Sequence, residues 1–383
     1  MMTMTFAVPR KSLLRHSGVR RNPVNSFVLD TGLRRHDELT QSYFASNLGA
    51  GYYAHTLPKD ALMNSGVRIL LMTLTALVSG HHVLAAYPER PIRMIVPSAA
   101  GGQPDTNSRL VAAELSKQIG QQVVVDNRPG ASSSIGFEAV ARAQPDGYTI
   151  GYGGFPLATN PSLLARVPYD VNKDFRMVIL TNISPNVIAI TPALPVNSIR
   201  ELIDYAKRYP DQLLFGTSGS GGTMHLSMEL FKIMTRTQMV HVPYKGMAQV
   251  ITEIIGGRLQ ILSDNVTSVL PHVTAGRLRA LGVTGPRRIP LAPDIPTVAE
   301  AGVPGYEITA WGGYIGPAGM PGPIVARLNA ELNKVIASPM IRERWLALGI
   351  EPVGGTPARF AEHVKKETAK WTDVIKRAGI KGD

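Results

Sequence analysis

Short apolar segments alternate along residues 87–383 with segments whose apolar residues recur at helical spacing. The first pattern is typical of buried β-strands and the second of amphipathic helices. It predicts strands at residues 93–96, 122–126, 148–153, 187–190, 213–217, 259–265, 278–284 and 306–317. It predicts helices at residues 106–115, 135–143, 161–164, 198–209, 224–234, 247–255, 266–275, 321–337, 339–348 and 357–378. Strands and helices that alternate at this spacing form βαβ units, so the sequence predicts an α/β fold with parallel strands.

One strand-to-helix connection consists of small residues. After the strand at 93–96 and Pro97 it reads Ser98, Ala99, Ala100, Gly101 and Gly102. Such a turn lets an anion approach the backbone N–H groups that a helix N-terminus leaves without partners. The alternative is a tight turn without a ligand, in which Asp105 is the N-cap of the helix. The glycine patterns of Walker and Rossmann loops are absent.

A second connection repeats this arrangement. It follows the strand at 213–217, which ends at Thr217, and reads Ser218, Gly219, Ser220, Gly221, Gly222 and Thr223. Two turns that each open a helix would suit a small anion held between two lobes. The pair Asp264 and Asn265 also comes at a predicted strand end, directly before a helix.

Other polar candidates follow neighbouring strands. Ligands of parallel sheets gather beyond the carboxyl ends of the strands, so residues 153–160 should face the same crevice, with Thr159 and Asn160 as contacts. Alternatively, either residue caps the helix predicted at 161–164. Tyr244 and Lys245 could present a phenol and a cation to an anion. In the alternative, Tyr244 belongs to a wall between the lobes and Lys245 lies in solvent, which we favour for Lys245.

The order of the elements indicates two lobes. Residues 87–188 and 309–383 are predicted to form the first lobe, and residues 189–308 the second. The segment at 306–317 is too long for one plain strand, and we interpret it as a strand that crosses back to the first lobe. Hinges are therefore expected near residues 185–190 and 306–312.

Composition places the chain among ordinary globular proteins. It has 383 residues, of which 44% are hydrophobic and 18% charged, enough for two domains with buried cores. The formal net charge is +12, but the excess of Lys and Arg is scattered along the chain. A moderately basic surface attracts small anions. Because no basic stripe with interleaved aromatic residues is present, we expect no nucleic-acid partner.

The N-terminal region contains the pattern of a secretory signal. Residues 63–68 form a short basic segment, 69–78 an apolar segment and 83–86 a small-residue cleavage site, so residues 63–86 are predicted to be a signal peptide. Residues 1–62 lack sustained periodicity and are interpreted as a non-native or disordered extension, with translation starting at Met63. The alternative is a genuine extension with a weak anchor helix. The chain has no cysteine. We therefore expect a freely soluble periplasmic protein without disulfides or a lipid anchor.

The residue types that carry catalysis do not form a set. His225, His241, His272 and His363 lie on separate predicted elements without metal-ligand spacing. Ser220 lacks the spacing of a nucleophile elbow and is better interpreted as a hydrogen-bond donor. Asp105 and Asp264 occur singly, and only a carboxylate pair across the two lobes stays open as a route to hydrolysis. We expect no enzyme activity, metal or cofactor.

Residues 87–383 resemble the periplasmic solute-binding receptors of the Bug type, which are related to tripartite tricarboxylate transporters and similar to TctC. The matching segments are residues 91–93, 96–97, 99–102 with Asp105, 124–130, 143–149, 160–163, 241–246, 293–302 and 317–319. The resemblance implies a two-lobed, type II-like periplasmic-binding-protein fold of the Venus-flytrap kind, with two crossings between the lobes. It also implies that a small carboxylate binds in the cleft.

Carried over by position, the resemblance and the candidates above give one predicted ligand-binding set. Its members are Ser98, Ala99, Ala100, Gly101, Gly102, Asp105, Gly154, Thr159, Asn160, Thr217, Ser218, Gly219, Ser220, Thr223, Tyr244, Asp264 and Asn265. Two departures alter the first turn. Ser98 replaces an aromatic residue of the family. Gln103 and Pro104 replace a small Gly-Thr pair, so one backbone donor is lost and Gln103 could contact a polar ligand group.

The expected function is therefore an extracytoplasmic receptor. It would capture a mono-, di- or tricarboxylate or an amino acid between the lobes, as a monomer, and deliver it to membrane subunits of a tripartite tricarboxylate-type transporter. The alternative is a sensor that presents its closed form to a sensor kinase. A small-molecule enzyme is the third interpretation.

Overall fold

The computed structural model describes residues 87–382 of the chain. The predicted signal peptide and the N-terminal extension lie outside the described residues. Within 87–382, no helix is long and apolar enough to cross a membrane.

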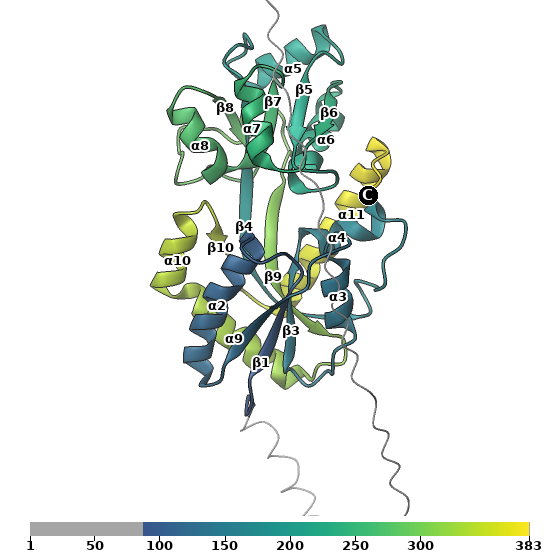
Figure 1. The fold of residues 1–383 in the computed structure, drawn as a ribbon, viewed down its shortest axis with the longest axis vertical. Helices are drawn as coiled ribbons and strands as arrows, with labels where there is room; N and C mark the ends of the chain where they lie inside the picture. The colour runs from purple at the N-terminus through teal and green to yellow at the C-terminus, as the bar shows by residue number, and fades with distance from the viewer. Residues whose placement is uncertain (1–86, 383) are drawn as a thin grey trace, which may run out of the picture. The chain divides into compact units, whose positions relative to one another are not determined.

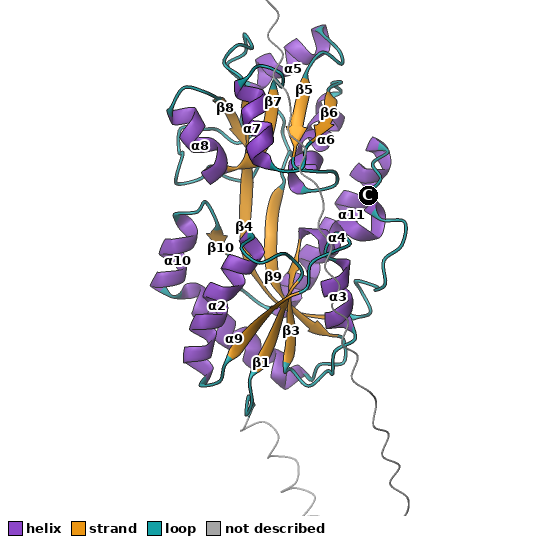
Figure 2. Ribbon diagram, in the orientation of Figure 1, coloured by secondary structure: helices purple, strands orange, loops and turns teal. Residues whose placement is uncertain are grey.

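The described chain alternates strands and helices, as Figures 1 and 2 show. The strands are β1 (Ile92–Val96), β2 (Val123–Asn127), β3 (Thr149–Gly154), β4 (Phe175–Ile190), β5 (Leu214–Thr217), β6 (Val240–Pro243), β7 (Ile261–Asn265), β8 (Arg279–Val283), β9 (Thr309–Pro317) and β10 (Glu351–Pro352). The helices are α2 (Gln103–Ile119), α3 (Ser134–Ala141), α4 (Phe155–Leu163), α5 (Ile199–Arg208), α6 (Thr223–Thr235), α7 (Met247–Ile255), α8 (Val266–Thr274), α9 (Gly322–Ala337), α10 (Pro339–Leu346) and α11 (Pro357–Ala378). The predicted α/β class is confirmed.

The strands form two sheets that share β4. The first sheet has the order β2-β1-β3-β9-β4, with β10 also paired to β4. The second has the order β4-β7-β5-β6, with β8 also paired to β4. Strand β1 runs parallel to β2 and β3, and β5 runs parallel to β6 and β7. Because β9 and β4 run antiparallel to their neighbours, both sheets are mixed rather than purely parallel.

Strand β4 is continuous between the sheets, as Figure 1 shows. It pairs with β9 as far as Pro185, which lies opposite Thr309, and then with β7 from Asn186, which lies opposite Asn265. The sequence predicted only residues 187–190 of this strand. Polar residues and Pro185 interrupt its apolar pattern near the middle, and proline is rare inside central strands. The predicted lobe boundaries and hinges stay predictions.

The carboxyl ends of the parallel strands face the passage of β4 between the sheets. In the first sheet, Gly154 at the end of β3 lies opposite Gly312, near the start of β9. In the second sheet, Asn265 at the end of β7 lies opposite Asn186 of β4. We call the carboxyl ends of β1, β2, β3, β5, β6 and β7 the crossing edge. Helices α2, α3, α4, α6, α7 and α8 all begin there.

Several helix boundaries correct the sequence predictions. Helix α2 begins at Gln103 with Gly102 as its N-cap, so the alternative that made Asp105 the N-cap is wrong. Helix α4 begins at Phe155 rather than at residue 161, so Thr159 and Asn160 lie inside it and cap no helix. The misleading signal was Pro161, since proline favours a first turn.

The hydrophobic interior joins the two sheets. One cluster of buried residues contains Trp371 and Trp311 from the first sheet and its helices, together with Phe215 and Leu226 from the second. Helix α11 packs against both α4 and α6. The second sheet and its helices are therefore supported by packing as well as by β4 and β9.

Close packing at β9 gives a stability prediction. A Cβ atom at Gly313 would lie 2.4 Å from the Ile179 carbonyl oxygen and 2.6 Å from the Phe360 ring. Gly313→Ala should therefore lower the free energy of unfolding by about 1–3 kcal/mol, as overpacking does. Urea unfolding would measure this as a lower midpoint at unchanged slope. Gly322→Ala is the control, because no heavy atom lies within 4 Å of its added Cβ. An equal midpoint for both variants would contradict the packing argument.

Candidate functional site

The first turn comprises residues 97–102, between β1 and α2. Ala99, Ala100 and Gly101 are exposed. Gly101 has φ +84°, a conformation that glycine adopts without strain. The Gly102 N–H donates to the Ala99 carbonyl at 3.3 Å, which closes the turn. Gly102 caps α2 without a side-chain hydrogen bond.

Asp105 supports the first turn through its side-chain carboxylate. Its carboxylate accepts from Gly101 N–H at 2.8 Å and from Asn127 Nδ2 at 2.9 Å, and it lies 2.9 Å from Arg109 Nε. Burial raises the pKa of this carboxyl, but the hydrogen bonds from Gly101, Arg109 and Asn127 outweigh burial and hold the pKa below its usual value. The carboxylate is therefore occupied within the protein and supports the turn.

Asn127 is a supporting residue that the sequence analysis missed. Besides Asp105, its amide donates to the Ser98 carbonyl at 3.1 Å, while its oxygen accepts from Arg109 at 2.9 Å. It is the last residue of β2, the strand beside β1. The rule that neighbouring parallel strands end at one edge could have found it.

The first turn of α2 leaves few backbone donors free. The first four N–H groups of an α-helix, counted from the N-cap, lack an intrahelical acceptor, and in α2 the N-cap N–H of Gly102 is already used in the turn. The three positions that follow the N-cap are therefore the ones to consider. In α2 these positions are Gln103, Pro104 and Asp105, and proline has no N–H. The N–H groups of Gln103 and Asp105 are therefore the donors that helix geometry offers to a ligand at this end.

The second turn comprises residues 217–222, between β5 and α6. The Thr217 hydroxyl donates to the Gly219 carbonyl at 2.8 Å, and the Gly221 N–H donates to Nδ1 of His225 at 3.1 Å. Gly221 has φ +76°, and a Cβ atom there would lie 2.2 Å from Leu163 of α4. The second turn therefore rests on a helix of the first sheet. Gly222, the N-cap of α6, has no heavy atom within 4 Å of an added Cβ.

Both turns lie at helix N-termini. Six helices begin at the crossing edge, and the N-caps Gly102, Gly154, Gly222 and Gly246 make no side-chain capping bond. Each such N-terminus carries a partial positive charge and free N–H donors. Their convergence makes the crossing edge suited to an anion without a metal or a free cation.

The crossing strand adds polar side chains that the sequence analysis missed. Ser184 and Asn186 alternate along β4, and the register places Asn186 opposite Asn265, with Ser263 two residues earlier on β7. Residues two apart on a strand share a face, so these four side chains lie on one face of the crossing. Asn265 Nδ2 donates to Ser184 Oγ at 3.3 Å.

Two of these side chains are buried without a partner among the described residues. They are Asn186 through Nδ2 and Ser263 through Oγ, with relative exposures of 5% and 0%. A buried unsatisfied donor costs about 1–3 kcal/mol, so such groups are usually paired with ordered water or a ligand. The polar residues that break the apolar pattern of β4 were the available signal.

Three predicted contacts are used inside the first sheet. A Cβ atom at Gly154 would lie 3.1 Å from the Tyr152 ring, so glycine fits this packing. The buried Thr159 hydroxyl donates to the Phe155 carbonyl at 3.4 Å. The buried Asn160 amide donates to the Ser132 carbonyl at 2.7 Å. The side-chain polar groups of Thr159 and Asn160 are thus used in these hydrogen bonds and not at the two turns.

The predicted residues of the second sheet divide in a similar way. Asn265 caps α8 by accepting from Thr267 N–H at 3.1 Å. Asp264 is buried opposite Val187, on the other face from Asn265, and burial raises the pKa of its carboxyl although hydrogen bonds from Ser268 and Asn265 lower it. Tyr244 joins the second turn through its N–H, which donates to the Thr217 carbonyl at 2.8 Å.

The remaining predicted residues lie at the second turn itself. Ser218 is exposed, and Gly219, Ser220 and Thr223 are half-buried, with Thr223 as the first residue of α6. Lys245 is exposed, in agreement with the interpretation that places it in solvent. Among residues 87–382, no group of three or more acidic or histidine side chains is arranged to hold a metal ion.

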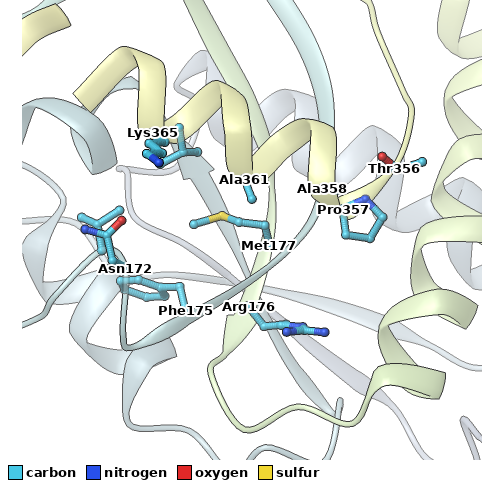
Figure 3. Close-up of a pocket in the computed structure, with 11 residues that line it drawn as sticks. Asn172, Phe175, Arg176, Met177, Thr356, Pro357, Ala358, Ala361 and Lys365 are labelled. Carbon is cyan, nitrogen blue, oxygen red and sulfur yellow. The ribbon is translucent and has the colours of Figure 1, made fainter. Parts of the chain in front are cut away.

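A cavity of about 520 Å³ lies apart from the turns, between the first turns of α11 and the start of β4. Its floor is apolar and includes Phe175 and Met177. Figure 3 shows that the cationic ends of Lys365 and Arg176 lie at different sides of this group and do not point to one another. They therefore do not form a joint anion site there.

Comparison with known proteins identifies the family. The model of the tripartite tricarboxylate transporter family receptor, TctC, matches residues 108–380. The chain belongs to this family. Family members are binding receptors rather than enzymes, and the predicted Bug-type resemblance is confirmed.

Relatives match over most of this receptor. It is 38% identical over 326 residues to a UPF0065 protein from the tcbD-tcbE intergenic region of Pseudomonas sp. strain P51, covering 84% of this chain and 97% of the relative. It is 34% identical over 297 residues to BugT of Bordetella pertussis, covering 77% of this chain and 91% of the relative.

Solved structures agree with the fold. The R. palustris protein Rpa4515 with adipate is 40% identical, with a TM-score of 0.67 over 78% of this chain and 100% of that protein. The periplasmic binding protein BugD is 34% identical, with a TM-score of 0.64 over 78% of this chain and 100% of BugD. MatC from Rhodopseudomonas palustris with bound malate is 30% identical, with a TM-score of 0.64 over 76% of this chain and 100% of MatC.

Asp105 provides a pH-dependent prediction. Its folded-state pKa lies below the unfolded value of about 3.9, so its stabilising contribution is present above that value and is lost as the pH falls through the folded pKa. Asp105→Asn should lower the free energy of unfolding by about 1–3 kcal/mol at pH 7. Urea unfolding at pH 7, 5 and 3 should show the difference shrinking at the lowest pH.

The control for this series is Asp373→Asn. Asp373 pairs with Arg377 on the surface of α11 with a 64% exposed side chain, so its replacement should change stability little at any of these pH values. A destabilisation by Asp105→Asn that stays the same down to pH 3 would show that the ionised carboxylate does not hold the turn.

Proposed function

We propose that this receptor captures a small carboxylate between the first and second turns. The observation that carries this proposal is the convergence of helix N-termini at the crossing edge, with glycine N-caps on both turns. A carboxylate placed there would accept hydrogen bonds from backbone N–H groups of both sheets. Because the donors are neutral, its recognition would depend on geometry rather than on a compensating cation.

The proposed ligand class is a small dicarboxylate. Two facing N-termini suit a molecule with an anionic group at each end, and relatives hold adipate and malate. Arg109 is the cation nearest to the first turn by its contacts, and it is engaged with Asp105 and Asn127. The unpaired Asn186 amide is a further donor for the middle of such a molecule.

We infer a binding mechanism in which the ligand joins the two turns. Within residues 87–382, β4 passes between the paired regions of the two sheets and β9 begins beside it, so a change in their backbone angles would move one turn toward the other. A ligand that contacts both turns binds the closed arrangement more tightly and shifts the population toward it. Closure also excludes water, which strengthens the hydrogen bonds to the carboxylate.

We place this receptor in the periplasm, as a partner of tripartite transporter subunits. The family description and the periplasmic relative BugD support this location. The predicted signal at residues 63–86 agrees with it. In this proposal, the membrane subunits bind the closed form and take up the ligand.

The proposal predicts a thermal shift with dicarboxylates. Adipate, malate and a panel of mono-, di- and tricarboxylates, amino acids and phosphate would be tested on the full chain. A ligand that binds only the folded state raises the melting temperature by mass action. We expect a dicarboxylate to give the largest shift, and a panel led by a monocarboxylate would contradict the proposed contact with both turns. A panel without any shift, or one led by phosphate, would contradict the proposed ligand class.

The same assay tests where the carboxylate binds. Gly222→Val adds an isopropyl group to open space at the N-terminus of α6, so it should weaken binding about 10-fold, or about 1.4 kcal/mol. Gly322→Val, at the N-terminus of α9 away from the crossing edge, is the control for stability. Equal affinities for both variants would show that the ligand does not use the second turn.

A further inference from the structure

Two stacked histidines lie directly under the second turn. The rings of His225 on α6 and His241 on β6 are 3.7 Å apart between centroids and inclined by 16°. Each ring contacts the second turn by a different route: Gly221 N–H donates to His225 Nδ1 at 3.1 Å, and His241 Nε2 lies 2.6 Å from the Thr217 hydroxyl. His225 is buried.

The contact with the backbone fixes the neutral tautomer of His225. A backbone N–H is always a donor, so Nδ1 of His225 must present its lone pair to Gly221 and the ring proton must lie on Nε2. Nε2 in turn lies 3.6 Å from the Glu229 carboxylate. The Thr217 hydroxyl lies within hydrogen-bond distance of the Gly219 carbonyl, at 2.8 Å, and of His241 Nε2, at 2.6 Å, so this contact ties His241 to the second turn in either tautomer.

We propose that His225 is a positioning residue for ligand binding, which holds the second turn in place only while its ring is neutral. This proposal rests on the proposed function of the second turn. When the ring gains a second proton, Nδ1 becomes a donor and faces the Gly221 N–H, so the hydrogen bond is lost. The turn then loses its anchor at the N-terminus of α6. Protonation of His225 would therefore weaken binding through the protein, without any change in the ligand.

The charged side chains beside the two rings come from α6. Glu229 faces both rings from α6, and Lys232 donates to the Glu229 carboxylate at 2.8 Å. Strand β5 contributes only the uncharged Phe215 and Thr217 to the stack. The pKa of His241 is lowered to about 4, mainly by burial and then by the neighbouring His225, while Glu229 raises it and Lys232 lowers it. His241 thus stays neutral between pH 5 and 8, and His225 is the ring whose protonation breaks a contact with the turn.

The decisive experiment compares two replacements of His225. In His225→Asn, the side-chain oxygen takes about the place of Nδ1 and accepts from Gly221 N–H without titrating. In His225→Leu, no acceptor remains. We expect His225→Asn to bind the best carboxylate of the panel within about 3-fold of the wild type at pH 7.5 but with an affinity that is flat to pH 5. We expect His225→Leu to bind roughly 5- to 10-fold more weakly, as the loss of one hydrogen bond allows.

His272→Asn is the matched control, because His272 lies on α8 of the same sheet and contacts neither turn through its side chain. It should keep the wild-type pH profile of ligand affinity. If His225→Asn also keeps the wild-type profile, or if His225→Leu binds as tightly as the wild type, the positioning role is wrong.

A measurement without ligand separates this role from the proposed function. Amide hydrogen exchange of Gly221 should be faster in His225→Leu than in the wild type and His225→Asn at pH 7.5, and it should accelerate in the wild type alone on acidification beyond the intrinsic pH effect. Nitrogen chemical shifts should report an unprotonated Nδ1 for His225 at pH 7.5. These signatures without carboxylate binding would overturn only the proposed function. Carboxylate binding without them would overturn only the role of His225.

Discussion

The structure depends on the backbone pairing of one long strand. Strand β4 satisfies the hydrogen bonds of β9 in the first sheet and of β7 and β8 in the second. The register of β4 with β7 brings Asn265 to the passage between the sheets. The register of β9, the other neighbour of β4, with β3 brings Gly154 there. A one-residue slip in either register would turn the polar face of the crossing away.

The site itself is made of backbone, and the side chains around it serve mainly to shape that backbone. Asp105 and Asn127 hold the first turn, and His225 holds the second. Such a site needs small residues at the turns and strong polar side chains beneath them. In this arrangement the carboxylate of Asp105, which supports the first turn, has its charge balanced by Arg109 and by hydrogen bonds from Gly101 and Asn127.

Much of the fold could be predicted from the sequence because periodicity is a local property. Helix α5 lies within one residue of the predicted bounds 198–209, with Ser198 as its N-cap accepting from Glu201 N–H at 3.2 Å, and α11 has the predicted bounds. Strand β4 was mostly missed because its polar side chains face the crossing, where function rather than core packing sets the pattern. The two turns were recognised from their small residues, and their role in ligand binding stays a proposal. Asn127 was missed although it ends the strand beside β1, and His225 was missed because this histidine was weighed only as a metal ligand, although its partner Gly221 lies four residues before it.

The two turns are held by chemically different groups, and this difference has a consequence for binding. The carboxyl of Asp105 has a lowered pKa, so the first turn keeps its support throughout the range in which imidazoles titrate. The second turn is held by a hydrogen bond to Nδ1 of His225, and this nitrogen must stay unprotonated to accept it. Protonation of His225 therefore affects the second turn and leaves the support of the first turn unchanged. A carboxylate would still meet the first turn at low pH, but it would lose the second contact that makes closure favourable, so the loss falls on the closed state.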